Sequence, residues 1–257
     1  MKFIVLVKQV PDTEEERRLT PATGRLDRDA GESVADEVNE RALEVALRYK
    51  DANKGTEIVV LTMGPAAAAQ ALRKALSMGA DSAVHVMDDL LEGADISTTA
   101  AVLAAAVQRT GFDAVIAGNE STDGRSGLVP AMVAEHLGLP LLSSLNTVEL
   151  TGSTVAGEVT AESGSLAVSA TLPAIVSVTE RSAEARFPNF KGIMTAKRKP
   201  LATLSLADLG LDPSVTGAAS TVLSISARPA RVAGKKIVDD GTAARELAEF
   251  LVAGRLV

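Results

Sequence analysis

Three loops of the sequence carry residue types suited to binding an anion. Each follows an apolar run of strand length, and they comprise residues 8–13, 63–65 and 118–127. The third reads Gly-Asn-Glu-Ser-Thr-Asp-Gly-Arg-Ser-Gly and precedes a segment with helical spacing. Glycines let backbone N–H groups approach a phosphate closely, and a helix N-terminus adds about half a positive charge. The loop is therefore a candidate phosphate site, and a simple turn capped by Ser126 fits its spacing equally well.

The other two loops are less specific. Lys8 directly follows the first apolar run, where it either neutralises a phosphate, pairs with Asp12 or remains a lysine on the rim. Residues 63–65, Met-Gly-Pro, fit either a close backbone approach to a ligand or a tight turn before a helix. Neither the Gly-x-x-x-x-Gly-Lys-Ser/Thr nor the Gly-x-Gly-x-x-Gly fingerprint occurs in the sequence. A nucleotide site would therefore be of a different kind.

Composition excludes several classes of chemistry. The 257 residues include no Cys and two His, which excludes disulfides, thiolate metal centres and a Cys nucleophile. We read His85, within a strand, as a core or edge histidine and His136 as a favourable charge near a helix end. No local Ser-His-Asp or paired-carboxylate pattern supports hydrolysis. Since the sequence has neither a signal-like segment nor an apolar run of membrane length, we expect a cytoplasmic protein without membrane insertion.

A basic segment at residues 181–200 stands out from the rest of the chain. Its net charge is +5, whereas the whole chain carries −7, and it holds two of the six aromatic residues, Phe187 and Phe190. Each apolar anchor that enters a partner's pocket contributes about 1.5–3 kcal/mol, and basic residues steer acidic partners. The segment is a candidate docking surface. Two alternatives remain open: the two Phe pack onto the core, or the cluster binds nucleic acid.

The order of the elements explains how these loops meet. Apolar runs at residues 3–7, 58–62, 83–86 and 114–117 alternate with helical segments at 35–50, 66–78, 94–109 and 128–137. This pattern predicts an α/β fold with a parallel sheet and right-handed crossovers. In such a sheet the three loops lie at the carboxyl edge and converge on one crevice.

The second half of the chain changes character. Alternating runs at residues 147–150, 154–160, 166–171 and 175–179 surround several glycines and predict an antiparallel hairpin addition. Beyond the irregular segment 181–200, residues 206–210, a Ser/Thr/Ala-rich stretch and an amphipathic 242–252 have too few apolar residues to fold alone. We expect an α/β domain at 1–200 that includes the basic segment, and a C-terminal arm at 201–257 that packs on a partner or on the main domain.

Taken together, these segments resemble the beta subunit of electron transfer flavoprotein, most closely its actinobacterial type. The resemblance spans nearly the whole chain and rests on residues 5–12, 36–39, 42–44, 63–65, 73–81, 117–124 and 186–199. It implies a Rossmann-like domain of the adenine-nucleotide-binding (HUP/ETF) type, in a heterodimer whose alpha subunit holds most of the FAD.

In this family the beta subunit binds AMP in a structural role. Lys8 is included for its position after the first run, and the remaining residues match the family's nucleotide-site motifs. The expected nucleotide-binding residues are Leu6, Lys8, Asp36, Glu37, Val38, Asn39, Met63, Gly118, Asn119, Glu120, Ser121, Thr122, Asp123, Gly124, Arg125, Ser126, Gly127, Leu128 and Val129.

The resemblance also implies partners. The family's recognition loop docks acyl-CoA and related flavin dehydrogenases, and Phe190 stands where that loop carries an anchoring Leu. The expected docking residues are Arg186, Phe187, Phe190, Lys191, Ile193 and Met194. Electrons pass from the dehydrogenase to FAD and then to a membrane quinone oxidoreductase, so the chain is a carrier subunit rather than an enzyme, with no catalytic residue, metal or nucleic acid.

Three alternatives remain. In electron-bifurcating relatives FAD replaces AMP, and the phosphate loop reads Asp-Gly-Asp-Thr-Ala-Gln-Val-Gly-Pro. In this chain Asp123-Gly124 and Val129-Pro130 agree with that form. Residues 125–128 depart from it, and this departure favours AMP. A stand-alone nucleotide sensor of the universal-stress type would need neither the basic segment nor the arm. An ATP-pyrophosphatase requires a Ser-Gly-Gly-x-Asp-Ser loop after the first strand, where this chain has Lys-Gln-Val-Pro.

Overall fold

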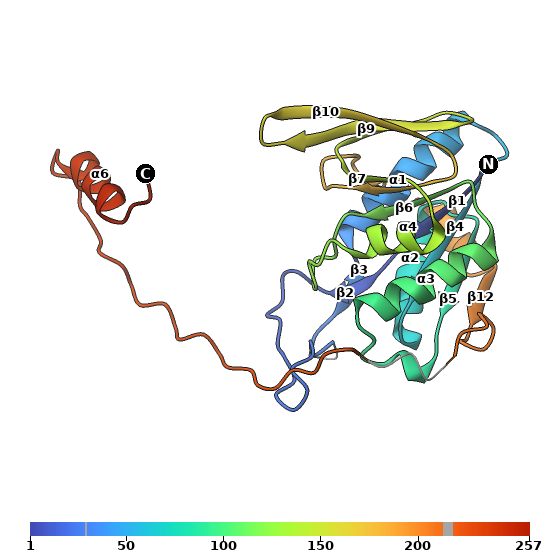
Figure 1. Cartoon of the computed structure of the whole chain (residues 1–257), viewed down its shortest axis with the longest axis horizontal. Helices are drawn as coiled ribbons and strands as arrows, with labels where there is room; N and C mark the ends of the chain where they lie inside the picture. The colour runs from blue at the N-terminus through green and yellow to red at the C-terminus, as the bar shows by residue number, and fades with distance from the viewer. Residues whose placement is uncertain (29, 213–217) are drawn as a thin grey trace. The chain divides into compact units, whose positions relative to one another are not determined.

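The computed structural model describes residues 1–28, 30–212 and 218–257. They form two units, Met1–Leu223 and Ser224–Val257, and each is described by itself. The first unit is built on a seven-stranded parallel sheet with helices on both faces (Figure 1). The fold class expected from the alternating runs is thereby confirmed.

The main sheet has the strand order β12-β5-β4-β1-β6-β11-β7, and neighbouring strands are parallel. The four strands expected in the first half all lie in it. The central strands read as unbroken apolar runs because helices cover both faces of the sheet. The bounds are β1 (Lys2–Leu6), β4 (Glu57–Met63), β5 (Ser82–Val86), β6 (Ala114–Gly118), β7 (Leu141–Leu145), β11 (Ala174–Val178) and β12 (Leu201–Leu204).

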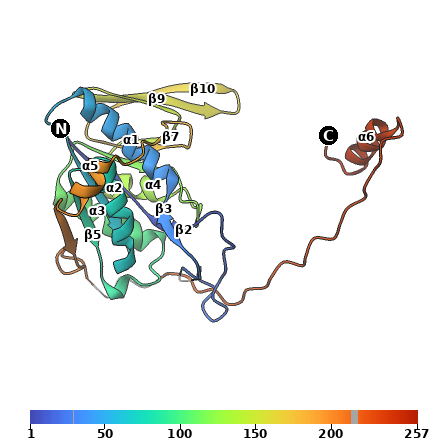
Figure 2. The same cartoon turned by 180° about the vertical axis from the view of Figure 1, so that it is seen from behind.

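Two helices cover each face of this sheet (Figures 1 and 2). On one face α1 (Glu37–Ala52) and α2 (Ala69–Met78) bury Leu43, Leu47 and Leu72 against Phe3 and Ile58. On the other, α3 (Ile96–Thr110) and α4 (Val129–Leu137) pack against alternate residues of the same strands. Short 3-10 turns, η1 (Ala66–Ala68) and η2 (Asp89–Leu91), precede α2 and α3.

A separate antiparallel sheet contains β8 (Thr147–Leu150), β9 (Thr154–Ala161) and β10 (Gly164–Thr171). The hairpin addition is therefore confirmed for three of its four expected strands. The fourth was wrong: β11 is parallel and lies between β6 and β7 in the main sheet. Its residues Ala174–Val178 are all buried, so the apparent alternation conceals a strand that is covered on both faces.

The region after β11 contains more regular structure than its sequence suggests. A short helix, α5 (Phe190–Ala196), interrupts the basic segment, and β12 follows it at the far edge of the sheet, beside β5. Leu206 is 1% exposed and belongs to the second core cluster, as do residues of α3. The first unit therefore continues beyond residue 200, where we expected it to end.

Two smaller features complete the description. Strands β2 (Gln9–Pro11) and β3 (Ser33–Ala35) form an antiparallel ladder that closes the loop between them. The second unit contains α6 (Ala243–Ala253), which has no buried residue. Among the helices that the described residues form, none combines the length and apolarity that crossing a bilayer requires.

Candidate functional site

The first and third candidate loops meet between β1 and β6. These strands are adjacent in the sheet, yet the chain leaves β1 toward α1 on one face and leaves β6 toward α4 on the other. The divergence makes this the topological switch point, where open α/β sheets bind ligands beyond the carboxyl ends of their strands. The expected ligand site therefore corresponds to the carboxyl ends of β1 and β6.

Asp36 joins the start of α1 to the loop after β6. It is fully buried at the N-cap of α1, where Oδ1 accepts a hydrogen bond of 3.1 Å from the backbone N–H of Val38. Its Oδ2 accepts bonds from both the backbone N–H and the hydroxyl of Thr122, at 2.7 and 3.1 Å. One carboxylate thus starts a helix and fixes the loop after β6, which explains why an acid is required here.

Asn39 and Gly118 set the distance between α1 and the sheet. The side-chain oxygen of Asn39 accepts the backbone N–H of Lys8 at 2.8 Å. A Cβ on Gly118 would lie 2.6 Å from Nδ2 of Asn39 and 3.0 Å from Cγ1 of Val38. Gly118 is therefore needed because α1 approaches the end of β6 more closely than any side chain permits.

The buried carboxylate of Asp123 forms ion pairs with two cationic side chains of the site. Its Oδ1 lies 2.7 Å from Nζ of Lys8 and its Oδ2 lies 2.7 Å from a guanidinium nitrogen of Arg28. Burial alone would raise the pKa of Asp123, but hydrogen bonds from Lys8, Ser121 and Arg28 and the charge of Lys8 hold it well below its usual range. Lys8 thus pairs with Asp123 and not with Asp12, the partner considered from the sequence.

Two arginines of this site were missed in the sequence. Arg28 contacts Asp123, and Arg17 donates a hydrogen bond to the backbone oxygen of Thr122. Both come from the long excursion between β2 and β3, which folds over the loop after β6. Residues 14–28 are rich in charge but carry no motif, so the only signal was a cluster of arginines near Lys8.

The N-terminus of α4 has no side-chain cap, and Pro130 in its first turn has no N–H. Its N-cap residue is Leu128, which makes no side-chain capping bond, so the alternative of a turn capped by Ser126 is wrong. The preceding loop is held in a tight conformation, with positive φ at Arg125 (50°) and Gly127 (64°). The first N–H groups of a helix that lacks a side-chain cap are suited to binding an anion.

The remaining expected nucleotide-site residues differ in position and exposure. Leu6, Val38 and Asn119 lie beside the crevice, whereas Glu37 is exposed on α1. Met63 lies at the end of β4 and packs in the second core cluster. The exposed part of the loop after β6 is Gly124, Arg125, Ser126, Gly127 and Leu128, and Glu120 forms an ion pair with Arg125 there.

The reading of His85 as a core histidine is confirmed. It is buried in β5, and its Nε2 lies 2.9 Å from the backbone oxygen of Gly64. The second candidate loop is thus held to the neighbouring strand by a side-chain hydrogen bond, as expected of a tight turn.

The basic segment presents its apolar residues to solvent. Phe187 is 93% and Phe190 80% exposed, and Ile193, Met194 and Lys191 are exposed as well. The alternative in which the two Phe pack onto the core is therefore wrong. Arg186, by contrast, faces the protein and pairs with Glu44 and Asp51 of α1.

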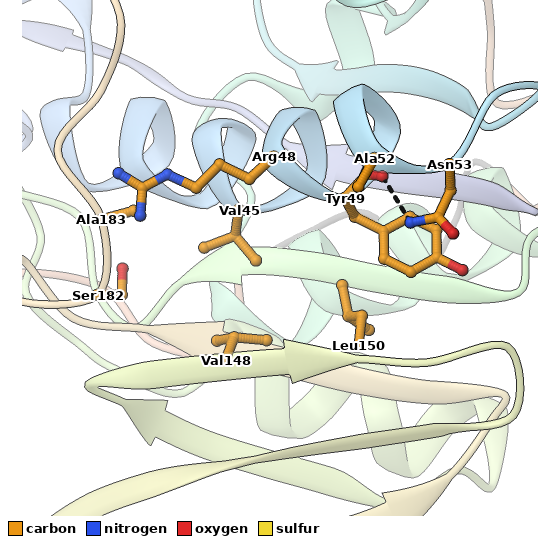
Figure 3. Close-up of a pocket in the computed structure, with 9 residues that line it drawn as sticks. All are labelled: Val45, Arg48, Tyr49, Ala52, Asn53, Val148, Leu150, Ser182 and Ala183. Atoms are coloured by element: carbon orange, nitrogen blue, oxygen red, sulfur yellow. Dashed lines mark hydrogen bonds between the residues drawn. The ribbon is translucent and has the colours of Figure 1, made fainter.

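A cavity of about 280 Å³ lies between α1 and β8 (Figure 3). Polar and apolar groups line it about equally, and none of the expected nucleotide-binding residues is among them. It is bounded by Val45, Arg48, Tyr49, Ala52, Asn53, Val148, Leu150, Ser182 and Ala183.

The chain is similar to known proteins over most of its length. Residues 23–209 match the model of the electron transfer flavoprotein domain. The chain is 48% identical to electron transfer flavoprotein subunit beta of Mycobacterium tuberculosis, over 99% of both chains. It is 36% identical to the subunit beta of Syntrophomonas wolfei and 33% identical to the caffeyl-CoA reductase-Etf complex subunit CarD of Acetobacterium woodii, in each case over 98% of this chain and 96–97% of the relative.

Proposed function

Because this chain belongs to the electron transfer flavoprotein family, we propose that it acts as the beta subunit of a heterodimeric electron transfer flavoprotein. The observation that carries the proposal is similarity from end to end, over 99% of both chains, to relatives that bear this subunit's name. A stand-alone nucleotide sensor or an ATP-pyrophosphatase is not favoured, since the family match includes the basic segment.

AMP is proposed to bind at the carboxyl ends of β1 and β6. The uncapped N-terminus of α4 offers N–H groups to its phosphate, and Lys8 and Arg28 add positive charge. Asp36 and Gly118 shape the loop without occupying its outer side. The role of the nucleotide here is structural, because the expected site residues join three segments that are distant in the sequence.

A second candidate is a bifurcating flavoprotein with FAD in this crevice. One relative is a subunit of a caffeyl-CoA reductase-Etf complex, and Asp123-Gly124 and Val129-Pro130 agree with the bifurcating loop. Residues 125–128 differ from the bifurcating loop, and the backbone at Arg125 has a φ of 50°. We therefore favour AMP.

The chain's own part in electron transfer is to bring partners together. An FAD shared with the alpha subunit supplies the redox chemistry, and this chain is a carrier subunit rather than an enzyme. The exposed Phe187 and Phe190 dock acyl-CoA and related flavin dehydrogenases, and a quinone oxidoreductase accepts the electrons. The second unit, with exposed Leu247 and Phe250 on α6, packs on the alpha subunit in the cytoplasm.

Co-expression tests the proposal directly. With the alpha subunit of the same genome, we expect a yellow one-to-one complex, whereas this chain alone is colourless or poorly folded. Mass spectrometry of the nucleotides released on denaturation then separates the candidates: AMP with one FAD supports the carrier, and two FAD support bifurcation. A chain that co-purifies with no flavin-containing subunit would contradict the proposal.

A further inference from the structure

The basic segment is attached to the helices beneath it at three points. We propose that Arg186, Gly192 and Lys199 are positioning residues that hold residues 187–196 in a preset conformation, ready to dock a partner with an apolar pocket and an acidic rim. This inference rests on the proposed function for the identity of the partner, whereas the attachment itself is a property of this chain. None of the three residues needs to touch the partner.

The first point is an ion pair with α1. Glu44 is 4% exposed, and its two carboxylate oxygens accept hydrogen bonds from Nε and Nη2 of Arg186 at 2.7 and 3.0 Å. The same Nη2 lies 2.8 Å from Oδ2 of Asp51, about two turns further along the same face of α1. These contacts raise the pKa of Arg186, the bonds from Glu44 contributing most. The two parallel hydrogen bonds between the guanidinium group and the Glu44 carboxylate fix the direction of the chain at Arg186, directly before Phe187.

The rest of α1 supports this attachment. Arg41 donates a hydrogen bond of 2.8 Å to the backbone oxygen of Ala183, three residues before Arg186. Nε of Arg48 lies 3.2 Å from Oε1 of Glu44. Figure 3 shows the Arg48 side chain running along α1 toward Ala183. Glu44 is therefore a buried charge between two guanidinium groups, which compensates for its desolvation.

The second point is a close backbone contact between α5 and α2, which lie side by side (Figure 2). Asn189 caps α5, since its Oδ1 accepts the N–H of Gly192 at 2.7 Å. A Cβ on Gly192 would collide with the backbone oxygen of Ser77 on α2. Only glycine lets α5 lie this close, and the contact determines how far Phe190 stands above the surface.

The third point is Lys199, at the end of the segment. Its ammonium group donates to the backbone oxygens of Leu76 and Ala80, at 2.8 and 2.5 Å. The Leu76 oxygen belongs to the last turn of α2, where carbonyl groups lack partners within the helix and the dipole favours a cation, and Ala80 follows the C-cap Gly79 directly. Burial lowers the pKa of Lys199, in keeping with a side chain directed inward.

These attachments divide the segment into two sets of side chains. Arg186 and Lys199 direct their charges inward, so they are not available to steer a partner. The exposed cations are Arg181, Lys191, Lys197 and Arg198, and along the chain they flank or alternate with the exposed Phe187, Phe190, Ile193 and Met194. An apolar pocket with acidic residues around it matches that outward set. Because the conformation is preset, binding does not have to order the segment.

The test uses the flavin-loaded complex of this chain with its alpha subunit. An acyl-CoA dehydrogenase with its acyl-CoA substrate is the electron donor, and the variants are Glu44→Gln, Gly192→Ala and Lys199→Met. Matched controls are Lys197→Met, an exposed cation of the same segment, and Gly152→Ala, whose added Cβ would meet no atom within 4 Å. Two quantities are measured for each variant. One is the amide hydrogen exchange of residues 187–196, and the other is the dependence of the rate of flavin reduction on the concentration of the complex.

In each attachment variant we expect exchange in 187–196 to accelerate while exchange in β1 and β6 stays unchanged. The KM for the complex should rise about tenfold, which corresponds to about 1.4 kcal/mol, with the limiting rate unchanged. Gly152→Ala should alter neither quantity, and Lys197→Met should raise KM without accelerating exchange. Faster exchange with an unchanged KM, or unchanged exchange, would overturn the inference. If the unmodified complex accepts no electrons from a flavin dehydrogenase, the proposed function fails, and hydrogen exchange still decides whether the attachment exists.

Discussion

The carboxylate of Asp36 holds Thr122 by two hydrogen bonds, 2.7 Å from its backbone N–H and 3.1 Å from its hydroxyl, although the two residues are far apart in the chain. The same carboxylate caps α1. A single buried side chain therefore joins the start of one helix to the loop that leads into another. The stability of the crevice and the binding of its ligand should change together when this side chain is altered.

Replacing Asp36 with Ala removes the cap and the tie to Thr122 at once. We expect the free energy of unfolding of the complex to fall by about 2–4 kcal/mol, from a lost cap and unpaired buried donors, and AMP to be released. Asp95→Ala is the control, because Asp95 caps α3 in the same way without contacting the crevice. Urea unfolding and nucleotide analysis are the measurements. Equal losses of stability in the two variants, with AMP retained in both, would contradict the role of the tie.

Asp123 should make stability depend on pH in the acidic range. Its pKa is lowered in the folded chain, whereas in the unfolded chain it titrates at about 3.9. The stabilisation is therefore complete above the unfolded pKa and is lost as pH falls through the lower folded value. We expect the urea midpoint to fall less steeply between about pH 5 and 3 in Asp123→Asn than in the unmodified chain. If the urea midpoints of the two proteins fall in parallel with pH, the contacts of Asp123 with Lys8 and Arg28 contribute nothing to the stability.

Gly118→Ala should destabilise the chain by about 1–3 kcal/mol, since its Cβ would lie 2.6 Å from the Asn39 amide and α1 would have to move outward. Gly124→Ala in the same loop is the control, because its Cβ would be 3.5 Å from the nearest atom, the Ser121 hydroxyl, at ordinary contact distance. Thermal unfolding compares the two. A smaller loss at Gly118 than at Gly124 would refute the close approach of α1.

Phe190→Ala should slow electron transfer from acyl-CoA dehydrogenase while leaving the flavin spectrum and the thermal stability unchanged. The ring is 80% exposed, so the folded chain loses little packing, whereas a docked complex loses an anchor worth about 1.5–3 kcal/mol. Leu166→Ala on β10 removes an apolar side chain that is also exposed but lies outside the basic segment. Steady-state reduction of the complex is the measurement, and an equal effect of both substitutions would remove Phe190 from the docking surface.

The sequence predicted best those elements in which every residue has the same environment. Residues 3–7 and 114–117 are apolar throughout because both faces of those strands are covered, and they were placed correctly. The strand at Ala174–Val178 was assigned to the wrong sheet because Ser177 gave it an apparent alternation. Ser177 is in fact buried, with its hydroxyl accepting the N–H of Ser144 from β7.

For the site, the sequence located the loops but not the contacts between them. Glycines and hydroxyl residues marked residues 118–127, and strand order placed the loop beside Lys8. The pairing of Asp123 with Arg28 depends on how the excursion between β2 and β3 folds, which no local pattern encodes. Likewise, Arg186 counted as an outward charge in the sequence, and only the position of Glu44 on α1 shows that it faces inward.

The basic segment is also the connection from β11 to β12, which lies at the opposite edge of the main sheet. Its inward residues therefore belong to the framework of the fold, whereas Phe187, Phe190, Ile193 and Met194 contribute little to it. Natural variation should follow this division, with the inward set retained among relatives that serve different dehydrogenases and the outward set diverging. Partner choice would then be open to redesign through four side chains, on a backbone that need not be rebuilt.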